Sequence, residues 1–134
     1  MRVLTSLLLG AALIGTAAAA PAAERDNSKG EAKLAKAIAG RVAGKPVNCI
    51  NQRNITSSQI IDRTAIVYQV GRTLYVNRPR IGESSLDDDD ILVTKTYSSQ
   101  LCSLDTIRLL DRSSRFETGF VGLGDFVPYV KPKS

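Results

Sequence analysis

The sequence contains no histidine and no tryptophan among its 134 residues. Histidine is the commonest general base in enzymes and a frequent zinc ligand, so its absence excludes histidine-based catalytic triads and most zinc sites. Neither a glycine-rich phosphate-binding loop nor a Gly-x-Ser-x-Gly nucleophile motif occurs in the chain. No catalytic motif is present, and a non-enzymatic domain that binds a partner protein or an envelope component is therefore the leading expectation.

Cysteine is also scarce, because only Cys49 and Cys102 are present. They form no Cys-x-x-Cys motif and no histidine can activate a thiolate, so a reactive thiol is the less favoured interpretation. Two distant cysteines in an exported chain are most simply explained by a structural disulfide. Such a bond would close a loop of about 54 residues, for which loop-closure entropy predicts a stabilisation of roughly 4 kcal/mol.

The N-terminus has the three parts of a secretory signal peptide. Methionine and arginine form a positively charged start, residues 3–15 are almost wholly apolar, and residues 16–23 are mainly small. The apolar stretch is shorter than the ~20 residues that a membrane-spanning helix needs, so we expect cleavage rather than retention as an anchor. Cleavage after Ala22 fits the small-residue rule, and cleavage after Ala19 is the alternative. The mature chain is therefore expected in the periplasm or secreted, without a transmembrane span.

Composition divides the chain into four segments. Residues 1–22 are the predicted signal peptide, and residues 23–44 are a polar segment that continues into an amphipathic helix. Residues 45–130 form the predicted β-rich domain, and residues 131–134 form a basic tail.

The net charge of +5 is unevenly distributed along the chain. Between Lys45 and Val130 ten basic residues balance ten acidic ones, so the basic excess lies in the flanking segments. A nucleic-acid-binding surface would combine a basic face with aromatic residues, and no such pattern is visible, so no nucleic-acid partner is expected. Arg72, Arg78 and Arg80 are candidates for an anion-binding patch that could meet envelope phosphates or an acidic partner. The alternative is that these arginines pair with acidic residues of the domain or face solvent.

An amphipathic helix is predicted before the β-rich domain. Ser28 and Glu31 fit a capping box, in which each side chain satisfies a backbone amide of the first helical turn. Leu34, Ile38 and Val42 then recur at four-residue steps and form one apolar stripe. Glycines and a proline follow the stripe and predict the end of the helix.

The rest of the chain is predicted to be mainly β, so the fold class is α+β with one N-terminal helix. About six short strands are expected to form a small antiparallel sheet, curled into a barrel-like shape or a sandwich. Glycines near the C-terminal end are expected at turns or bulges. The strand candidates are residues 47–50, 64–70, 73–77, 91–97, 106–111, 120–121 and 126–130.

The most conspicuous motif is the run Asp87-Asp88-Asp89-Asp90. Carboxylate oxygens are the ligands that Ca²⁺ prefers, so this run is a candidate metal site of a calcium-stabilised structural module. It lacks the alternate spacing, the glycine and the glutamate of an EF-hand loop, and adjacent carboxylates repel one another. A solvated turn before a strand is the alternative interpretation, and no other cofactor is expected.

Asp62, Asp105 and Asp125 are the candidates for acid–base chemistry without histidine. Each lies beside an apolar segment, where a turn or capping role is the more usual one. A histidine-free hydrolase, or a metal-dependent enzyme that uses Asp87 to Asp90 with Asp62 or Asp105, is the alternative to a binding domain. Nothing in the sequence spacing brings two of these carboxylates together.

Several short motifs occur in a fixed order between Cys49 and Pro128: Cys49-Ile50, Ile61-Asp62 followed by Ile66, Tyr75 and Asn77, Cys102-Ser103-Leu104-Asp105, and Gly124-Asp125-Phe126-Val127-Pro128. In these motifs the chain resembles a family of small exported bacterial proteins that is classed as a domain of unknown function. That family often carries a further cysteine shortly before the closing Gly-x-Phe-x-Pro, whereas residues 120–123 contain none here. The resemblance implies secretion and a small fold, and it implies no mechanism.

Overall fold

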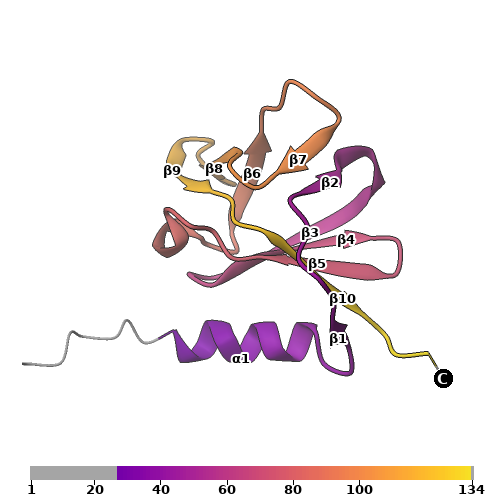
Figure 1. Cartoon of the computed structure of the whole chain (residues 1–134). Helices are drawn as coiled ribbons and strands as arrows, with labels where there is room; N and C mark the ends of the chain where they lie inside the picture. The colour runs from indigo at the N-terminus through magenta and orange to yellow at the C-terminus, as the bar shows by residue number, and fades with distance from the viewer. Residues whose placement is uncertain (1–26, 134) are drawn as a thin grey trace, which may run out of the picture.

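The computed structural model of the protein describes residues 27–133 (Figure 1). The predicted signal peptide, residues 1–22, lies outside this range. Within the range the chain forms one α-helix, ten strands and two short 3-10 segments, and no helix there is long and apolar enough to cross a membrane. The elements are α1 (Ser28–Ala37), β1 (Val42–Ala43), β2 (Cys49–Asn51), β3 (Ile55–Ile61), β4 (Ala65–Val70), β5 (Thr73–Asn77), β6 (Asp90–Thr94), β7 (Gln100–Cys102), β8 (Thr106–Asp111), β9 (Glu117–Gly122) and β10 (Phe126–Val130), with the 3-10 segments at Gln52–Asn54 and Glu83–Ser85.

The strands form three antiparallel sheets. A five-stranded sheet has the order β1-β10-β5-β4-β3, a two-stranded sheet pairs β2 with β7, and a three-stranded sheet has the order β6-β8-β9. In Figure 1, α1 lies along one side of the five-stranded sheet, and the two smaller sheets lie on its other side. The fold is mainly β with one N-terminal helix, as predicted, and the sheets are layered without closing into a barrel.

Alternate side chains of strand β4 pack into two different apolar cores. Ile66 and Tyr68 point to the side of the smaller sheets, where they join the larger buried cluster. Ala65 and Val67 point to the opposite side and pack with Leu34 of the helix. Successive side chains of a strand face opposite sides of the sheet. Both sides of β4 are covered by an apolar core, so its sequence is a nearly continuous apolar run.

The helix is shorter than its apolar stripe predicted. It ends at Ala37, with Ile38 at the C-cap, and Gly40 then turns the chain with a positive φ of 74°. Val42 consequently lies in β1 with 56% of its surface exposed. The prediction that Val42 continues the helical stripe was therefore wrong, because a left-handed glycine ends the helix before that residue.

The start of the helix is also fixed differently from the predicted capping box. The N-cap residue is Asn27, whose side chain makes no capping bond and whose Nδ2 instead donates to the carbonyl of Arg63 at 2.7 Å. The carboxylate of Glu31 accepts two hydrogen bonds from Arg78, at 2.7 and 2.9 Å. Contacts with distant segments therefore help to anchor this end of α1, which begins at Ser28.

Three strands have the predicted bounds, namely β5, β8 and β10, whereas β1, β3 and β7 were not predicted. The longest of the missed strands is β3, which carries the sequence Ile-Thr-Ser-Ser-Gln-Ile-Ile. Residues 56–59 of this strand are all exposed, so it lacks the apolar alternation by which a half-buried strand is recognised. β3 forms a hairpin with the following strand, β4, and is held in an extended conformation by this pairing. The polar sequence of β3 does not predict the pairing.

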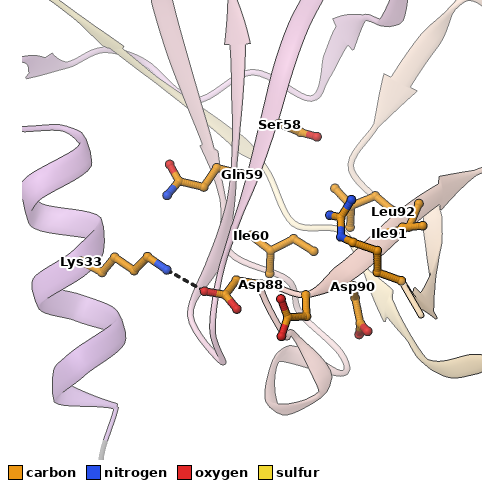
Figure 2. A pocket seen from close by; sticks show the side chains of 10 residues that line it. Lys33, Ser58, Gln59, Ile60, Asp88, Asp90, Ile91 and Leu92 are labelled. Atoms are coloured by element: carbon orange, nitrogen blue, oxygen red, sulfur yellow. Dashed lines mark hydrogen bonds and ion pairs between the residues drawn. The ribbon is translucent and has the colours of Figure 1, made fainter. Parts of the chain in front are cut away.

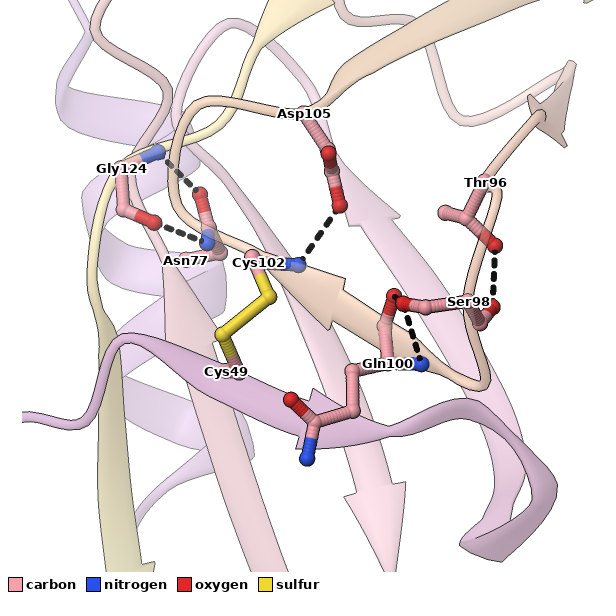
Figure 3. The surroundings of a disulfide bond; sticks show 8 residues. All are labelled: Cys49, Asn77, Thr96, Ser98, Gln100, Cys102, Asp105 and Gly124. Atoms are coloured by element: carbon pink, nitrogen blue, oxygen red, sulfur yellow. Dashed lines mark hydrogen bonds between the residues drawn. A yellow bond between two sulfur atoms is a disulfide. The ribbon is translucent and has the colours of Figure 1, made fainter.

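Cys49 and Cys102 form the predicted disulfide (Figure 3). They lie directly opposite each other in β2 and β7, with their Cα atoms 4.0 Å apart and a sequence separation of 53. The carboxylate of Asp105 accepts a hydrogen bond from the Cys102 amide at 2.7 Å and so closes the turn after β7. A disulfide of this kind is typical of proteins that fold in an oxidising compartment.

Candidate functional site

The three arginines of the predicted anion-binding patch do not lie together. Arg72 lies in the turn before β5 and Arg78 follows that strand, so a five-residue strand of about 17 Å separates them. Arg78 pairs with Glu31, while the Nε atom of Arg80 donates to the carbonyl of Leu123 at 3.0 Å. The guanidinium groups of Arg78 and Arg80 are thus bound by other groups of the protein. Arg72 takes no part in these contacts.

The run of four aspartates divides between a turn and a strand. Asp87, Asp88 and Asp89 are exposed, whereas Asp90 begins β6 and is only 6% exposed. The hydroxyl of Thr118 donates to the Asp90 carboxylate at 2.7 Å, which compensates part of the cost of burying it. The carboxylate of Asp87 accepts from the Asp89 amide at 2.9 Å and tightens the turn.

The fold brings Asp62 to Asp87 and Asp88, which the sequence spacing did not reveal. One carboxylate oxygen from each of the three residues lies within 4.8 Å of the others, so these are the residues that could hold a hard cation. Asp62 accepts from the Asp88 amide at 2.7 Å, and Asp88 pairs with Lys33 at 2.9 Å. Each of the three carboxylates also accepts a hydrogen bond from the protein, and these bonds connect the segment of Asp87 and Asp88 to Asp62 and to Lys33.

The other two candidate carboxylates lie elsewhere. Asp105 is bound to the Cys102 amide beside the disulfide, and Asp125 is exposed in the loop before β10. Within residues 27–133 neither of them joins the Asp62 cluster. The pair of facing carboxylates that a histidine-free hydrolase would need is therefore not formed by Asp62 and Asp105.

A cleft lies between β3 and β6, which we call the β3–β6 cleft. Its larger part has a volume of about 530 Å³, and Figure 2 shows Ser58 and Ile60 on one side of it and Leu92 on the other. Its smaller part, of about 310 Å³, shares Ser58 and Leu92 with the first, so the two parts are continuous. Lys33, Gln59, Asp88, Asp89, Asp90, Ile91 and Arg112 complete the lining of the larger part.

The two strands that line this cleft are edge strands of different sheets. β3 is the last strand of the five-stranded sheet and β6 is the first strand of the three-stranded sheet, so each pairs on one side only. Edge strands usually carry lysine, proline or inward charges that prevent further pairing. β3 contains no charged residue and no proline, and its one irregularity is a register shift between Ile55 and Ser57. Its outer edge is therefore open to pairing with another extended chain.

Tyr68 lines the smaller part of the cleft together with three apolar residues, Ile55, Leu92 and Leu101, and three polar ones, Gln52, Ser58 and Thr94. Its side chain is only 3% exposed, its ring packs against Phe126, and its hydroxyl has no hydrogen-bond partner within the described residues. Burial raises the pKa of Tyr68, so the hydroxyl stays protonated. A buried hydroxyl without a partner is unfavourable, and it can be satisfied by a ligand that enters the cleft.

One charged residue of the cleft, Lys33, is held in an ion pair. It donates a hydrogen bond to the Asp88 carboxylate, which raises the pKa of that lysine. Lys33 therefore stays protonated and cannot serve as a general base for the neighbouring Ser58.

Of the residues that line this cleft, the sequence analysis singled out Asp88, Asp89 and Asp90 as candidate site residues, and it did not identify Ser58, Tyr68 or Leu92. A signal is nevertheless present, because the segment Ile55–Ile61 is extended, uncharged and free of proline. Comparisons with protein-family models, with curated proteins and with solved structures found no match to this chain. The resemblance to a family of exported bacterial proteins therefore stays a prediction.

Proposed function

We propose that this protein is an exported, non-enzymatic module that binds an extended segment of a partner polypeptide in the β3–β6 cleft. The observation that carries the proposal is a cleft between two sheet edges, lined by Tyr68, whose buried hydroxyl has no hydrogen-bond partner within the described residues. An extended segment supplies the backbone N–H and C=O groups that sheet edges bind. It would also supply a partner for the tyrosine hydroxyl.

The length of the shorter strand sets the length of the ligand. β6 has five residues, and at about 3.3 Å per residue it spans roughly 17 Å. A bound segment of about five residues would pair with β3 on one side and β6 on the other. It would join the five-stranded and three-stranded sheets, which contact each other here through side chains.

The lining of the cleft favours a particular side-chain pattern. The Tyr68 end presents Ile55, Leu92 and Leu101 beside polar residues, and these side chains favour a large apolar residue of the ligand. At the other end Asp88 is neutralised by Lys33 and Asp90 is bound by Thr118, whereas Asp89 has no side-chain partner in residues 27–133. A basic residue at that end would complement Asp89, so the ligand is an extended segment with one apolar and one basic anchor.

Export is part of the proposal and rests on the leader and on the disulfide. Mass spectrometry of the protein from its native source tests it directly. The expected result is an N-terminus at Ala23 and a mass that shows Cys49 and Cys102 joined. An intact Met1 together with two free thiols would contradict export.

Selection from a phage-displayed library of linear heptapeptides tests the binding function. The expected result is enrichment of extended sequences with an apolar and a basic residue. The variant Ser58→Arg should lower the affinity of a selected peptide at least about tenfold, because Ser58 lines both parts of the cleft. Ser57→Arg is the matched control, since Ser57 is the exposed neighbour on the same strand and lines neither part. Equal losses in both variants, or no enrichment at all, would count against the proposal.

A further inference from the structure

Basic residues from three distant parts of the described chain converge near one edge of the five-stranded sheet. Val42 pairs with Val130, and Tyr129 pairs with Leu74. Continuing the first register by one residue places Arg41 beside Lys131. Continuing the second by two residues places Lys131 beside Arg72, so three cationic residues form one row across β1, β10 and β5.

These residues line a second cavity, of about 580 Å³, which also includes Lys133. We call the site formed by Arg41, Arg72, Lys131 and Lys133 the basic cleft. Four of its lining residues are cationic and none is acidic. Cationic groups gathered around one cavity repel one another, so this arrangement carries a cost that a bound anion would relieve.

Arg41 is held in place before any ligand binds. Its Nη1 atom donates to the carbonyl of Arg72 at 2.7 Å and to the carbonyl of Tyr129 at 3.2 Å. Both partners are backbone carbonyls, one in the turn before β5 and one in β10, so the guanidinium group is fixed without being neutralised. Its remaining N–H groups can form charge-assisted hydrogen bonds with an oxyanion.

We infer that the basic cleft binds phosphate groups. A phosphate offers several strong acceptor oxygens and a charge that matches a cluster of arginine and lysine side chains. The phosphate could belong to a lipid headgroup at a membrane surface or to a free phosphate compound, and both sources present the same chemistry. The inference is independent of peptide binding, since the basic cleft shares no lining residue with the β3–β6 cleft.

Two probes distinguish the sources. Retention of the purified protein is measured on vesicles of phosphatidylglycerol and on vesicles of phosphatidylcholine, and pyrophosphate binding is measured by calorimetry. Retention on phosphatidylglycerol alone would identify a lipid headgroup, and saturable pyrophosphate binding would identify a free phosphate compound. Absence of both would overturn the inference.

A pair of charge-matched variants locates the site. The variant Arg72→Ser/Lys131→Ser/Lys133→Ser should weaken whichever binding is observed by at least about tenfold. Its control, Lys29→Ser/Lys36→Ser/Lys95→Ser, removes the same charge from exposed positions outside the basic cleft and should bind like the wild type. Thermal melts establish that both variants fold. Equal loss in the two variants would show that net charge alone is responsible, which would contradict a site at the basic cleft.

Discussion

Asn77 and Gly124 exchange two hydrogen bonds inside the protein, although 47 residues separate them (Figure 3). The Nδ2 atom of Asn77 donates to the Gly124 carbonyl at 2.7 Å, and the Gly124 amide donates to the Asn77 Oδ1 atom at 3.0 Å. Asn77 is fully buried at the end of β5. Its side chain therefore pairs with the loop before β10 in the way that a neighbouring strand would.

Replacing this side chain should destabilise the fold strongly. Asn77→Ala would leave the buried amide and carbonyl of Gly124 without partners, so we expect a loss of about 2–4 kcal/mol in the free energy of unfolding. Urea denaturation followed by circular dichroism measures it. The control is Asn48→Ala at an exposed position, which should cost less than about 0.5 kcal/mol. A small loss for Asn77→Ala would show that the two hydrogen bonds contribute little.

The disulfide should contribute a large part of the stability. β2 and β7 have three residues each and pair only with one another, so the covalent link maintains a contact between distant segments. The double variant Cys49→Ala/Cys102→Ala should unfold at a lower urea concentration, with a loss of up to about 4 kcal/mol. Reduction of the wild type with dithiothreitol should give a similar shift. An unchanged denaturation midpoint in both experiments would contradict a stabilising role.

The ion pair between Glu31 and Arg78 predicts a dependence of stability on pH. Hydrogen bonding by Arg78 lowers the pKa of Glu31 below the value of 4.5 that applies in the unfolded chain. The contribution of Glu31 is therefore complete above pH 4.5 and is lost as the pH falls through the lowered pKa of the folded state. Both side chains are about half exposed, so screening limits the contribution to about 0.5 kcal/mol.

The variant Glu31→Gln isolates this contribution in thermal melts between pH 7 and pH 3. It should melt slightly below the wild type at pH 7, and the difference should shrink as Glu31 of the wild type becomes protonated. A difference that stays constant over this range would show that the charge of Glu31 is not involved.

The sequence predicted most of the architecture that depends on local pattern. The apolar run of β4, the hairpin to β5 and the final strand β10 follow from alternation and from turn residues, and the disulfide follows from the presence of only two cysteines. The missed strand β3 owes its conformation to pairing with β4 and not to its own polar sequence. Likewise, the exposed position of Val42 follows from the backbone turn at Gly40.

The candidate sites were harder to predict, because each consists of residues that only the fold brings together. The contact of Asp62 with Asp88 depends on how two turns pack, and the row of Arg41, Lys131 and Arg72 depends on the register of three strands. Arg72 was singled out from the sequence, but its neighbours in the structure are basic residues of the flanking segments. Tyr68 gave no signal, since a tyrosine in an apolar strand is usually a core residue.

The hydroxyl of Tyr68 should affect stability and binding in opposite directions. Tyr68→Phe removes a buried hydroxyl that has no partner within the described residues, so the free protein should become more stable by about 1–3 kcal/mol. The same variant should bind a selected heptapeptide about tenfold more weakly, because it cannot form the hydrogen bond to the ligand. Urea denaturation and calorimetry measure the two effects. A less stable variant with unchanged peptide affinity would show that the hydroxyl is not a ligand-binding group.

Amide hydrogen exchange with and without a selected heptapeptide tests strand addition most directly. Bound peptide should slow the exchange of amides in both β3 and β6, since each of these edge strands would gain a new hydrogen-bonded neighbour. Protection confined to other segments, or seen equally throughout the protein, would contradict binding between the two edges.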